Sequence, residues 1–364
     1  MAKTLQALHI HAGPQALAHI REHGLHPAHI GVIPGAAGGP KGLILGPLDR
    51  FIFGEWLAQS QQPVHLVGAS IGAWRMATAC LNESVTAFVR LEHDYIHQHY
   101  ELPPGQKRVK AEQVSREFGH NLQRFYGGRI AEVLQHPRYR LHVLTSRGRH
   151  VLRREHPLAT PLGYAGAYLS NAVARPALGA WLERVVFSSA GPLPFDVSDF
   201  RTRQQPLTEA NFMAAVQASC SIPFALQAVH DIPGAEAGAY WDGGITDYHL
   251  HLNWQTPTDR PEGRIVLYPH FQRQVVPGWL DKALKWRHRP TPFLDRTIVL
   301  APNPEWVQTL PNGKLPDRTD FMTYDQDLGA RVKVWNAAAS ASQQLADEWA
   351  AWLHKPDLQR VHPL

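Results

Sequence analysis

The sequence predicts an α/β fold with a central, mostly parallel sheet flanked by helices. Short apolar runs, typical of buried strands, alternate along the chain with helical segments, and glycine-rich turns follow two of these runs. The 364 residues are 44% hydrophobic and 18% charged, which is enough apolar material for the core of one large domain. No apolar run reaches the roughly 18 residues of a membrane-spanning helix, so none is predicted.

The first elements are bounded by glycine and proline. A helix over residues 14–23 is expected to end at Gly24, because glycine commonly closes a helix. A buried strand over residues 29–33 is stopped by the Pro-Gly pair that follows it. After a glycine-rich loop, the pattern predicts a helix over residues 42–57 that tolerates Pro47.

A second buried strand, residues 64–67, leads into another glycine-containing turn and a helix that runs to about Leu81. The alanine-rich tail over residues 325–352 predicts one long helix, whereas regions 95–135 and 150–180 have helical or irregular patterns. Further strands are expected at residues 140–145, 184–188, 264–268 and 297–300.

Composition and charge exclude several classes of protein. The net charge is +5, but the basic residues are scattered and lack a zinc-finger or RNA-binding pattern, so no nucleic-acid partner is expected. The two cysteines, Cys80 and Cys220, form no C-x-x-C pair, which argues against a disulfide framework and a structural zinc site. No apolar signal region is seen near the first residue, so we expect a cytoplasmic protein, with peripheral membrane contact as a further expectation.

The first chemical motif is the G-x-S-x-G sequence Gly68-Ala69-Ser70-Ile71-Gly72, which lies between an expected strand and an expected helix. A sharp turn there lifts a serine hydroxyl clear of the sheet, and the glycines remove clashes at the turn. The motif therefore predicts Ser70 as a nucleophile. The alternative is an ordinary helix start made of small residues.

The second motif, residues 35–42, is rich in glycine and also follows a strand. A nucleotide-binding P-loop is excluded, because Pro40 and Gly42 stand where that motif needs glycine and serine or threonine. What is left is a row of main-chain amides that could hold an oxyanion, with Lys41 adding positive charge. The alternatives are a plain glycine-rich turn and a solvated lysine.

The third motif is Trp241-Asp242-Gly243-Gly244. An Asp-Gly pair commonly marks only a tight turn. The functional interpretation is a carboxylate at a strand end that reaches another loop, where Asp242 would be the base for Ser70.

Together these motifs resemble the patatin-like phospholipase family, whose pattern is an oxyanion loop, a G-x-S-x-G turn and a later D-G-[GA] motif. The segment 218–223 also resembles that family's A-S-x-x-x-P sequence, and the likeness spans residues 28–250. The resemblance implies a Ser–Asp dyad on a three-layer, modified α/β-hydrolase-type fold, with lipid acyl hydrolase activity and no metal or other cofactor. Residues 1–27 would then be an N-terminal helical lead-in, 28–250 the catalytic core, and 251–364 an extension that completes the same domain.

Two positions depart from the family pattern. Ala37 replaces the first glycine of the oxyanion loop, and Pro40 has no N–H to donate. The oxyanion hole is therefore expected to use the amides of Gly38, Gly39 and Lys41 together with that of Ile71.

The expected function is hydrolysis of a lipid or lipid-like carboxylic ester through an acyl-serine intermediate. One alternative is an esterase with a Ser-His-Asp triad, acting on another ester or a thioester, for which His249 and His251 are candidates. Another is a catalytically weak or inactive relative that binds acyl lipids. His93 and His97 have a spacing that could ligate a metal, but the H-E-x-x-H motif is absent and no metal is expected.

The segment 279–289 resembles an interfacial helix. As a helix it would place Trp279, Ala283 and Trp286 on one face, with Lys282, Lys285 and Arg289 on another. The alternative is a surface helix whose apolar face packs on the core.

Overall fold

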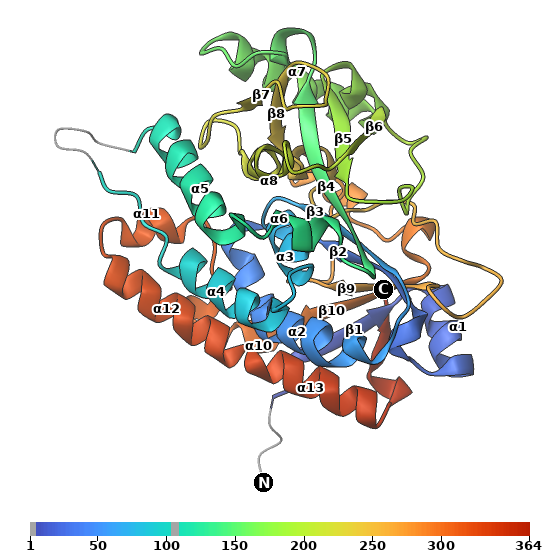
Figure 1. Ribbon diagram of the computed structural model, residues 1–364. Helices are drawn as coiled ribbons and strands as arrows, with labels where there is room; N and C mark the ends of the chain where they lie inside the picture. The colour runs from blue at the N-terminus through green and yellow to red at the C-terminus, as the bar shows by residue number, and fades with distance from the viewer. Residues whose placement is uncertain (1–4, 103–108) are drawn as a thin grey trace.

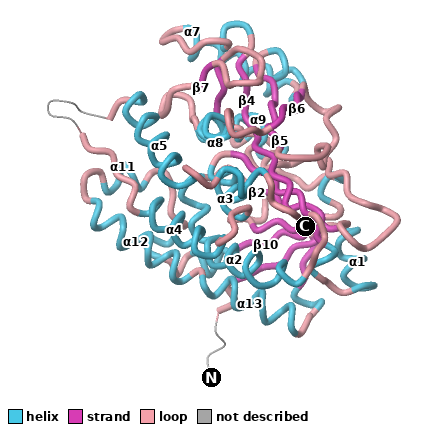
Figure 2. The backbone as a smooth tube through the Cα atoms, viewed as in Figure 1, coloured by secondary structure: helices cyan, strands magenta, loops and turns pink. Residues whose placement is uncertain are grey.

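A mixed, mostly parallel sheet runs through the molecule, and helices flank it (Figure 1). The computed structural model describes residues 5–102 and 109–364. Over these residues the sheet has 11 strands, in the order β11-β1-β10-β9-β2-β3-β4-β5-β6, with β8 paired to β4 and β7 paired to β8. Figure 2 shows the strands gathered in the interior with helices around them. The predicted α/β class is therefore confirmed.

The strands extend over Leu8–Ala12 (β1), Ile30–Gly35 (β2), Val64–Ala69 (β3), Tyr139–Gly148 (β4), Leu182–Ser188 (β5), Thr202–Pro206 (β6), Val229–His230 (β7), Ala239–Asp242 (β8), Ile265–Pro269 (β9), Thr297–Pro302 (β10) and Val361–Pro363 (β11). The α-helices extend over Pro14–His23 (α1), Gly46–Phe51 (α2), Ile71–Ala79 (α3), Ser84–Ile96 (α4), Ala111–Tyr126 (α5), Ile130–Leu134 (α6), Ala159–Val173 (α7), Phe212–Cys220 (α8), Gly244–Asp247 (α9), Pro304–Val307 (α10), Asp320–Tyr324 (α11), Leu328–Ala341 (α12) and Gln343–His354 (α13).

The centre of the sheet is built from the apolar runs that the sequence predicts as strands. Strands β9, β2, β3 and β4 are parallel neighbours, and β2 is buried along its whole length. In the β2–β3 pair, Gly35 lies opposite Gly68. Because both strands end at this edge, the glycine-rich loop after β2 and the serine turn after β3 leave the sheet side by side.

Strand β8 brings the third motif to the same edge. It runs antiparallel to β4, with Asp242 opposite Thr145. Since β4 is the neighbour of β3, a residue at the end of β8 lies close to the turn that follows β3.

Three predicted elements differ from the structure. The lead-in 1–27 contains strand β1 as well as the predicted helix α1, and β1 pairs with β10 and β11. The expected helix 42–57 is a series of 3₁₀, α and π turns, with Pro47 in the first turn of its α-helical part. The tail forms two helices, α12 and α13, which meet at Ser342.

The prediction of an interfacial helix over residues 279–289 is wrong. The segment forms two short 3₁₀ turns, Trp279–Asp281 and Lys285–Arg287. The buried carboxylate of Asp281 accepts hydrogen bonds from Asn171, Arg175 and Arg287, and these contacts hold the chain in turns.

Among the described residues, the helices are all too short or too polar to pass through a bilayer.

Candidate active site

Ser70 lies at the sharp turn between strand β3 and helix α3. Its backbone φ of 57° and ψ of −130° fall where non-glycine residues are rarely found. A Cβ on Gly68 would lie 2.4 Å from the Cα of Ala73, and a Cβ on Gly72 would lie only 1.8 Å from a carbonyl oxygen of β2. The predicted strand, strained serine turn and helix are therefore confirmed, and this is the geometry that exposes a nucleophile.

The Ser70 hydroxyl donates a hydrogen bond to the carboxylate of Asp242. Ser70 Oγ lies 2.7 Å from Asp242 Oδ2, and both side chains are buried. The other carboxylate oxygen, Oδ1, accepts the N–H of Gly244 at 2.7 Å. The two residues expected to form a dyad are thus brought together although 172 positions separate them in the chain.

The surroundings of Asp242 favour its use as a base. Burial raises the pKa of its carboxyl group, and the charge of Arg318 and the hydrogen bonds from Ser70 and Gly244 oppose that rise. A carboxylate with a raised pKa has a higher affinity for a proton than an exposed one. It is therefore better suited to accept the proton of a hydroxyl nucleophile.

The end of helix α8 fixes both halves of the dyad. The N–H of Ser70 donates to Ser219 Oγ at 3.0 Å, and that hydroxyl donates to the carbonyl oxygen of Leu144 at 2.7 Å. The N–H of Asp242 donates to the carbonyl oxygen of Ser221 at 2.9 Å. The segment 218–223 was identified only as a match to the family's A-S-x-x-x-P sequence. The positioning role of Ser219 was not predicted.

Three main-chain amides at the site have no hydrogen-bond acceptor within residues 5–102 and 109–364. They belong to Gly38, Gly39 and Ile71, three of the four residues expected to form the oxyanion hole, whereas the fourth, Lys41, lies inside the 3₁₀ helix Gly39–Leu45. Gly39 and Ile71 line the same cavity as Ser70, and Gly39 has a left-handed φ of 58°. The loop and the start of α3 therefore offer main-chain donors beside the hydroxyl.

The two departures in this loop have structural explanations. The Ala37 N–H is already used, because it donates to the carbonyl oxygen of Tyr248 at 2.9 Å. Pro40 occupies the start of a 3₁₀ turn, where a missing N–H removes no helical hydrogen bond. Ala37 therefore takes no available donor from the loop, whereas Pro40 leaves it one free amide fewer than another residue would.

A cavity of about 370 Å³ opens beside Ser70. This volume falls within the range of about 300–1,000 Å³ that is usual for small-molecule sites. Most of its lining is aromatic or aliphatic, so it suits an apolar chain attached to a carbonyl group at Ser70. The apolar lining includes Trp74, Val114, Phe118, Ile222, Leu226 and Phe321.

Three basic side chains, Lys41, Lys282 and Arg318, lie around the dyad. Arg318 lines the cavity and also a smaller hollow beside Asp242. Loss of solvent and the neighbouring positive charges lower the pKa of Lys41 and bring that of Lys282 to about 8. The two lysines lie over the rings of Phe271 and Tyr248, and the carboxylates of Asp317 and Asp242 only partly oppose the lowering of their pKa values. The site is therefore attractive to an anionic group.

The histidines considered for other roles lie elsewhere. His249 Nδ1 contacts the main chain of Gln274 and Val276, and His251 Nε2 lies 2.8 Å from Thr291 Oγ1. Burial lowers the pKa of both rings, to about 4 for His251. Within the described part of the chain, neither ring forms a hydrogen bond with the dyad.

His93 and His97 stack on the exposed face of α4, with ring centroids 4.1 Å apart. Over the residues that the structure describes, no group of three or more His, Cys, Asp or Glu side chains is arranged to hold a metal ion.

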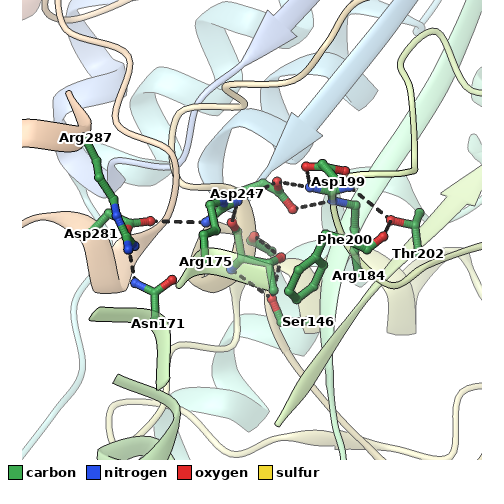
Figure 3. Close-up of polar contacts among 12 residues, drawn as sticks. Ser146, Asn171, Arg175, Arg184, Asp199, Phe200, Thr202, Asp247, Asp281 and Arg287 are labelled. Carbon is green, nitrogen blue, oxygen red and sulfur yellow. Dashed lines mark hydrogen bonds and ion pairs between the residues drawn. The ribbon is translucent and has the colours of Figure 1, made fainter. Parts of the chain in front are cut away.

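A buried ion-pair network holds the segment that follows Asp242 (Figure 3). Arg184 of β5 donates two hydrogen bonds to the carboxylate of Asp247, at 2.7 and 2.6 Å. Arg175 donates to a carbonyl oxygen within α9 at 2.6 Å, and Ser146 Oγ donates to the main-chain oxygen of Asp242 at 2.9 Å. This network was not predicted, because its members are far apart in the sequence and no local pattern links them.

Comparison with protein-family models and curated proteins identified no relative of this chain. No protein-family model matches the chain, and no curated protein matches it. The function must therefore be inferred from the geometry of the site.

Proposed function

We propose that the protein is a serine acyl hydrolase of the patatin-like type, which cleaves lipid or lipid-like carboxylic esters. The observation that carries the proposal is the 2.7 Å hydrogen bond from Ser70 Oγ to the buried Asp242 carboxylate at a strained strand-to-helix turn. The order of the three motifs around one edge of an α/β sheet supports the finer assignment to the three-layer patatin-like fold.

In the first half of the reaction, Ser70 Oγ attacks the ester carbonyl while Asp242 accepts its proton. Negative charge develops on the carbonyl oxygen of the tetrahedral intermediate. The amides of Gly38, Gly39, Lys41 and Ile71 are the donors that would hold this oxyanion, and each such donor is typically worth about 3–4 kcal/mol in the transition state.

The intermediate collapses when the ester C–O bond breaks and the alcohol leaves with the proton from Asp242. In the second half, Asp242 takes a proton from water, the hydroxide attacks the acyl-serine, and the carboxylic acid is released as Ser70 regains its proton. The apolar cavity beside Ser70 supports an acyl chain as the retained group. The basic cluster of Lys41, Lys282 and Arg318 supports a substrate with a negatively charged group near the ester.

The test combines hydrolysis with active-site labelling. Wild-type protein should hydrolyse p-nitrophenyl esters and be labelled at Ser70 by a fluorophosphonate, as located by peptide mass spectrometry. S70A should lose both properties, with activity reduced by about 10⁴-fold or more. The matched control S198A removes an exposed serine that bonds only to Asp196, and it should retain both.

Labelling at Ser70 without turnover would instead favour an acyl-binding protein. Loss of activity in H249A or H251A with a normally folded protein would favour a histidine-based triad.

A further inference from the structure

Helix α7 carries an exposed apolar stripe. Leu158 precedes the helix, and Leu162, Leu169 and Val173 follow at spacings that place all four on one face. Their exposed fractions are 73%, 72%, 66% and 87%, which is unusual for large aliphatic side chains. We call these four residues the α7 stripe. The helix lies at the top of the view in Figure 1, at the end of the molecule opposite α12 and α13.

The opposite face of α7 already provides its attachment to the fold. Gly163, Tyr164 and Ala167 are buried, and the Tyr164 ring packs edge-on against Trp241 of β8 at 6.1 Å. Helix α7 also contains no charged residue, so its outer face does not follow the polar pattern of an ordinary surface helix. The α7 stripe is therefore not needed to hold the helix in place.

A basic side chain lies near the first end of the stripe, and basic and aromatic side chains lie at the other end. At the first end, a Cβ on Gly163 would lie 3.1 Å from Val151, and the exposed Arg153 follows Val151 by two positions in the chain. At the other end, Arg287 donates to the carbonyl oxygen of Ala172 at 3.3 Å, which brings the turn 285–287 beside α7.

That second turn carries Trp286, which is 64% exposed, between the exposed side chains of Lys285 and Arg289. Apolar side chains flanked by arginine, lysine and tryptophan match the chemistry of an anionic lipid surface.

One exposed aromatic side chain, Phe224, lies between the buried face of α7 and the candidate active site. Phe224 is 60% exposed, and its ring lies 6.0 Å from that of Tyr164 of α7. Its neighbours Ile222 and Ala225 line the cavity that contains Ser70, and Pro223 lines the hollow beside Asp242. Phe224 therefore links the buried face of α7, which carries Tyr164, to the neighbourhood of the candidate site.

We propose that the α7 stripe, together with Trp286 and the flanking Arg153, Lys285 and Arg289, docks the protein on an anionic membrane surface. The aliphatic side chains enter the boundary of the acyl region while the cations remain among the headgroups. This deepens the proposed function, because it keeps the protein at a surface that contains lipid esters, but the docking itself does not require hydrolysis.

The experiment is co-sedimentation of the full chain with vesicles of phosphatidylcholine, with and without phosphatidylglycerol. Wild-type protein should bind the vesicles that contain phosphatidylglycerol. L162S/L169S should lower the partition coefficient by at least about tenfold, since two leucines no longer enter the bilayer. The matched control V85S/V89S replaces two exposed valines of α4 and should bind as wild type.

A second variant, R153Q/K285Q/R289Q, should remove the preference for phosphatidylglycerol and the sensitivity of binding to salt. Absence of wild-type binding, or equal binding by L162S/L169S, would overturn the proposal. A dimer in solution that L162S/L169S converts to monomer would instead identify the stripe as a protein interface.

Failure of docking and failure of the proposed function can be distinguished. Hydrolysis of a short, water-soluble ester should be normal in L162S/L169S, and vesicle binding should be normal in S70A. If no ester is hydrolysed but wild-type protein still binds vesicles through the stripe, the docking proposal stands and the hydrolase proposal fails.

Discussion

The last residue of β8, Asp242, and the last residue of α9, Asp247, are held in opposite ways. Burial raises the pKa of Asp242, whose direct partners are a hydroxyl and an amide. Burial acts in the same direction on Asp247, but the charge and hydrogen bonds of Arg184 and the charge of Arg175 outweigh it and lower the pKa. One carboxylate is anchored by ion pairs, and the other, the proposed base, has no ion pair among its hydrogen-bond partners in the described part of the chain.

This difference separates a structural role from a chemical one. A carboxylate with a lowered pKa stabilises the fold when it is ionised, whereas one with a raised pKa costs stability in the ionised state. Asp247 therefore pins the segment that presents Asp242, and the stability it contributes offsets the cost of keeping a base away from solvent.

The largest expected effect is on activity in D242N. Removal of the base should lower kcat for ester hydrolysis by about 10³–10⁴-fold. Stability at neutral pH should be unchanged or higher, because the variant no longer buries an ionised group whose folded pKa is raised. Steady-state kinetics and thermal unfolding of the same sample test both statements, and a markedly lower Tm would contradict the comparison.

The next largest effect is on stability in D247N. Neutralising this carboxylate leaves Arg184 buried with a weaker partner, which should cost about 3–5 kcal/mol in the free energy of unfolding. The control D199N neutralises the other carboxylate bound to Arg184. The Asp199 side chain is 25% exposed, so the loss in the free energy of unfolding should be smaller. Urea denaturation measures both, and equal losses would show that Asp247 is not the principal anchor.

A smaller effect on stability is expected at the serine turn, where close packing of the main chain, and not an ion pair, fixes the geometry. G72A would place a Cβ 1.8 Å from the carbonyl oxygen of Gly35, so the turn must shift. We expect a loss of about 1–3 kcal/mol in stability, together with reduced activity. The control is G329A in α12. A Cβ at this position would lie 3.6 Å from its nearest neighbouring atom, so the substitution should be neutral or slightly stabilising.

The smallest effect is a difference between two pH profiles. Because the pKa of Asp242 is raised, activity should fall on acidification at a pH above the ordinary aspartate value of 3.8. The pKa of Asp247 in the folded protein is lowered. Its contribution to stability is therefore present above pH 3.8, the ordinary aspartate pKa, and is lost only as the pH falls through the lower pKa of the folded state. The gap in unfolding free energy between wild type and D247N should therefore persist at a pH where activity has already declined.

Sequence reasoning succeeded where a short stretch of chain determines the structure. The turn around Ser70 follows from two glycines and a buried strand, and the apolar runs of β2 and β3 mark the parallel centre of the sheet. The pairing of Ser70 with Asp242 required a resemblance as well, since no local rule links positions so far apart.

Other elements were missed because their patterns are weak. Strand β1 alternates leucine and isoleucine with histidines, and β6 is almost wholly polar, so neither has the apolar run of a buried strand. The segment 279–289 was misjudged because Asp281, a charged residue, is buried there. Two of its three partners, Asn171 and Arg175, come from a distant part of the chain, and only the folded structure brings them to it.

The hydrogen bond from the Ala37 N–H to the Tyr248 carbonyl ties the donor loop to the stretch that directly follows α9. The proposed oxyanion donors and the proposed base are therefore linked through one stretch of main chain. A displacement of the chain after Asp242 would pull on both at once, so the proposed catalytic groups would assemble or come apart as a single unit.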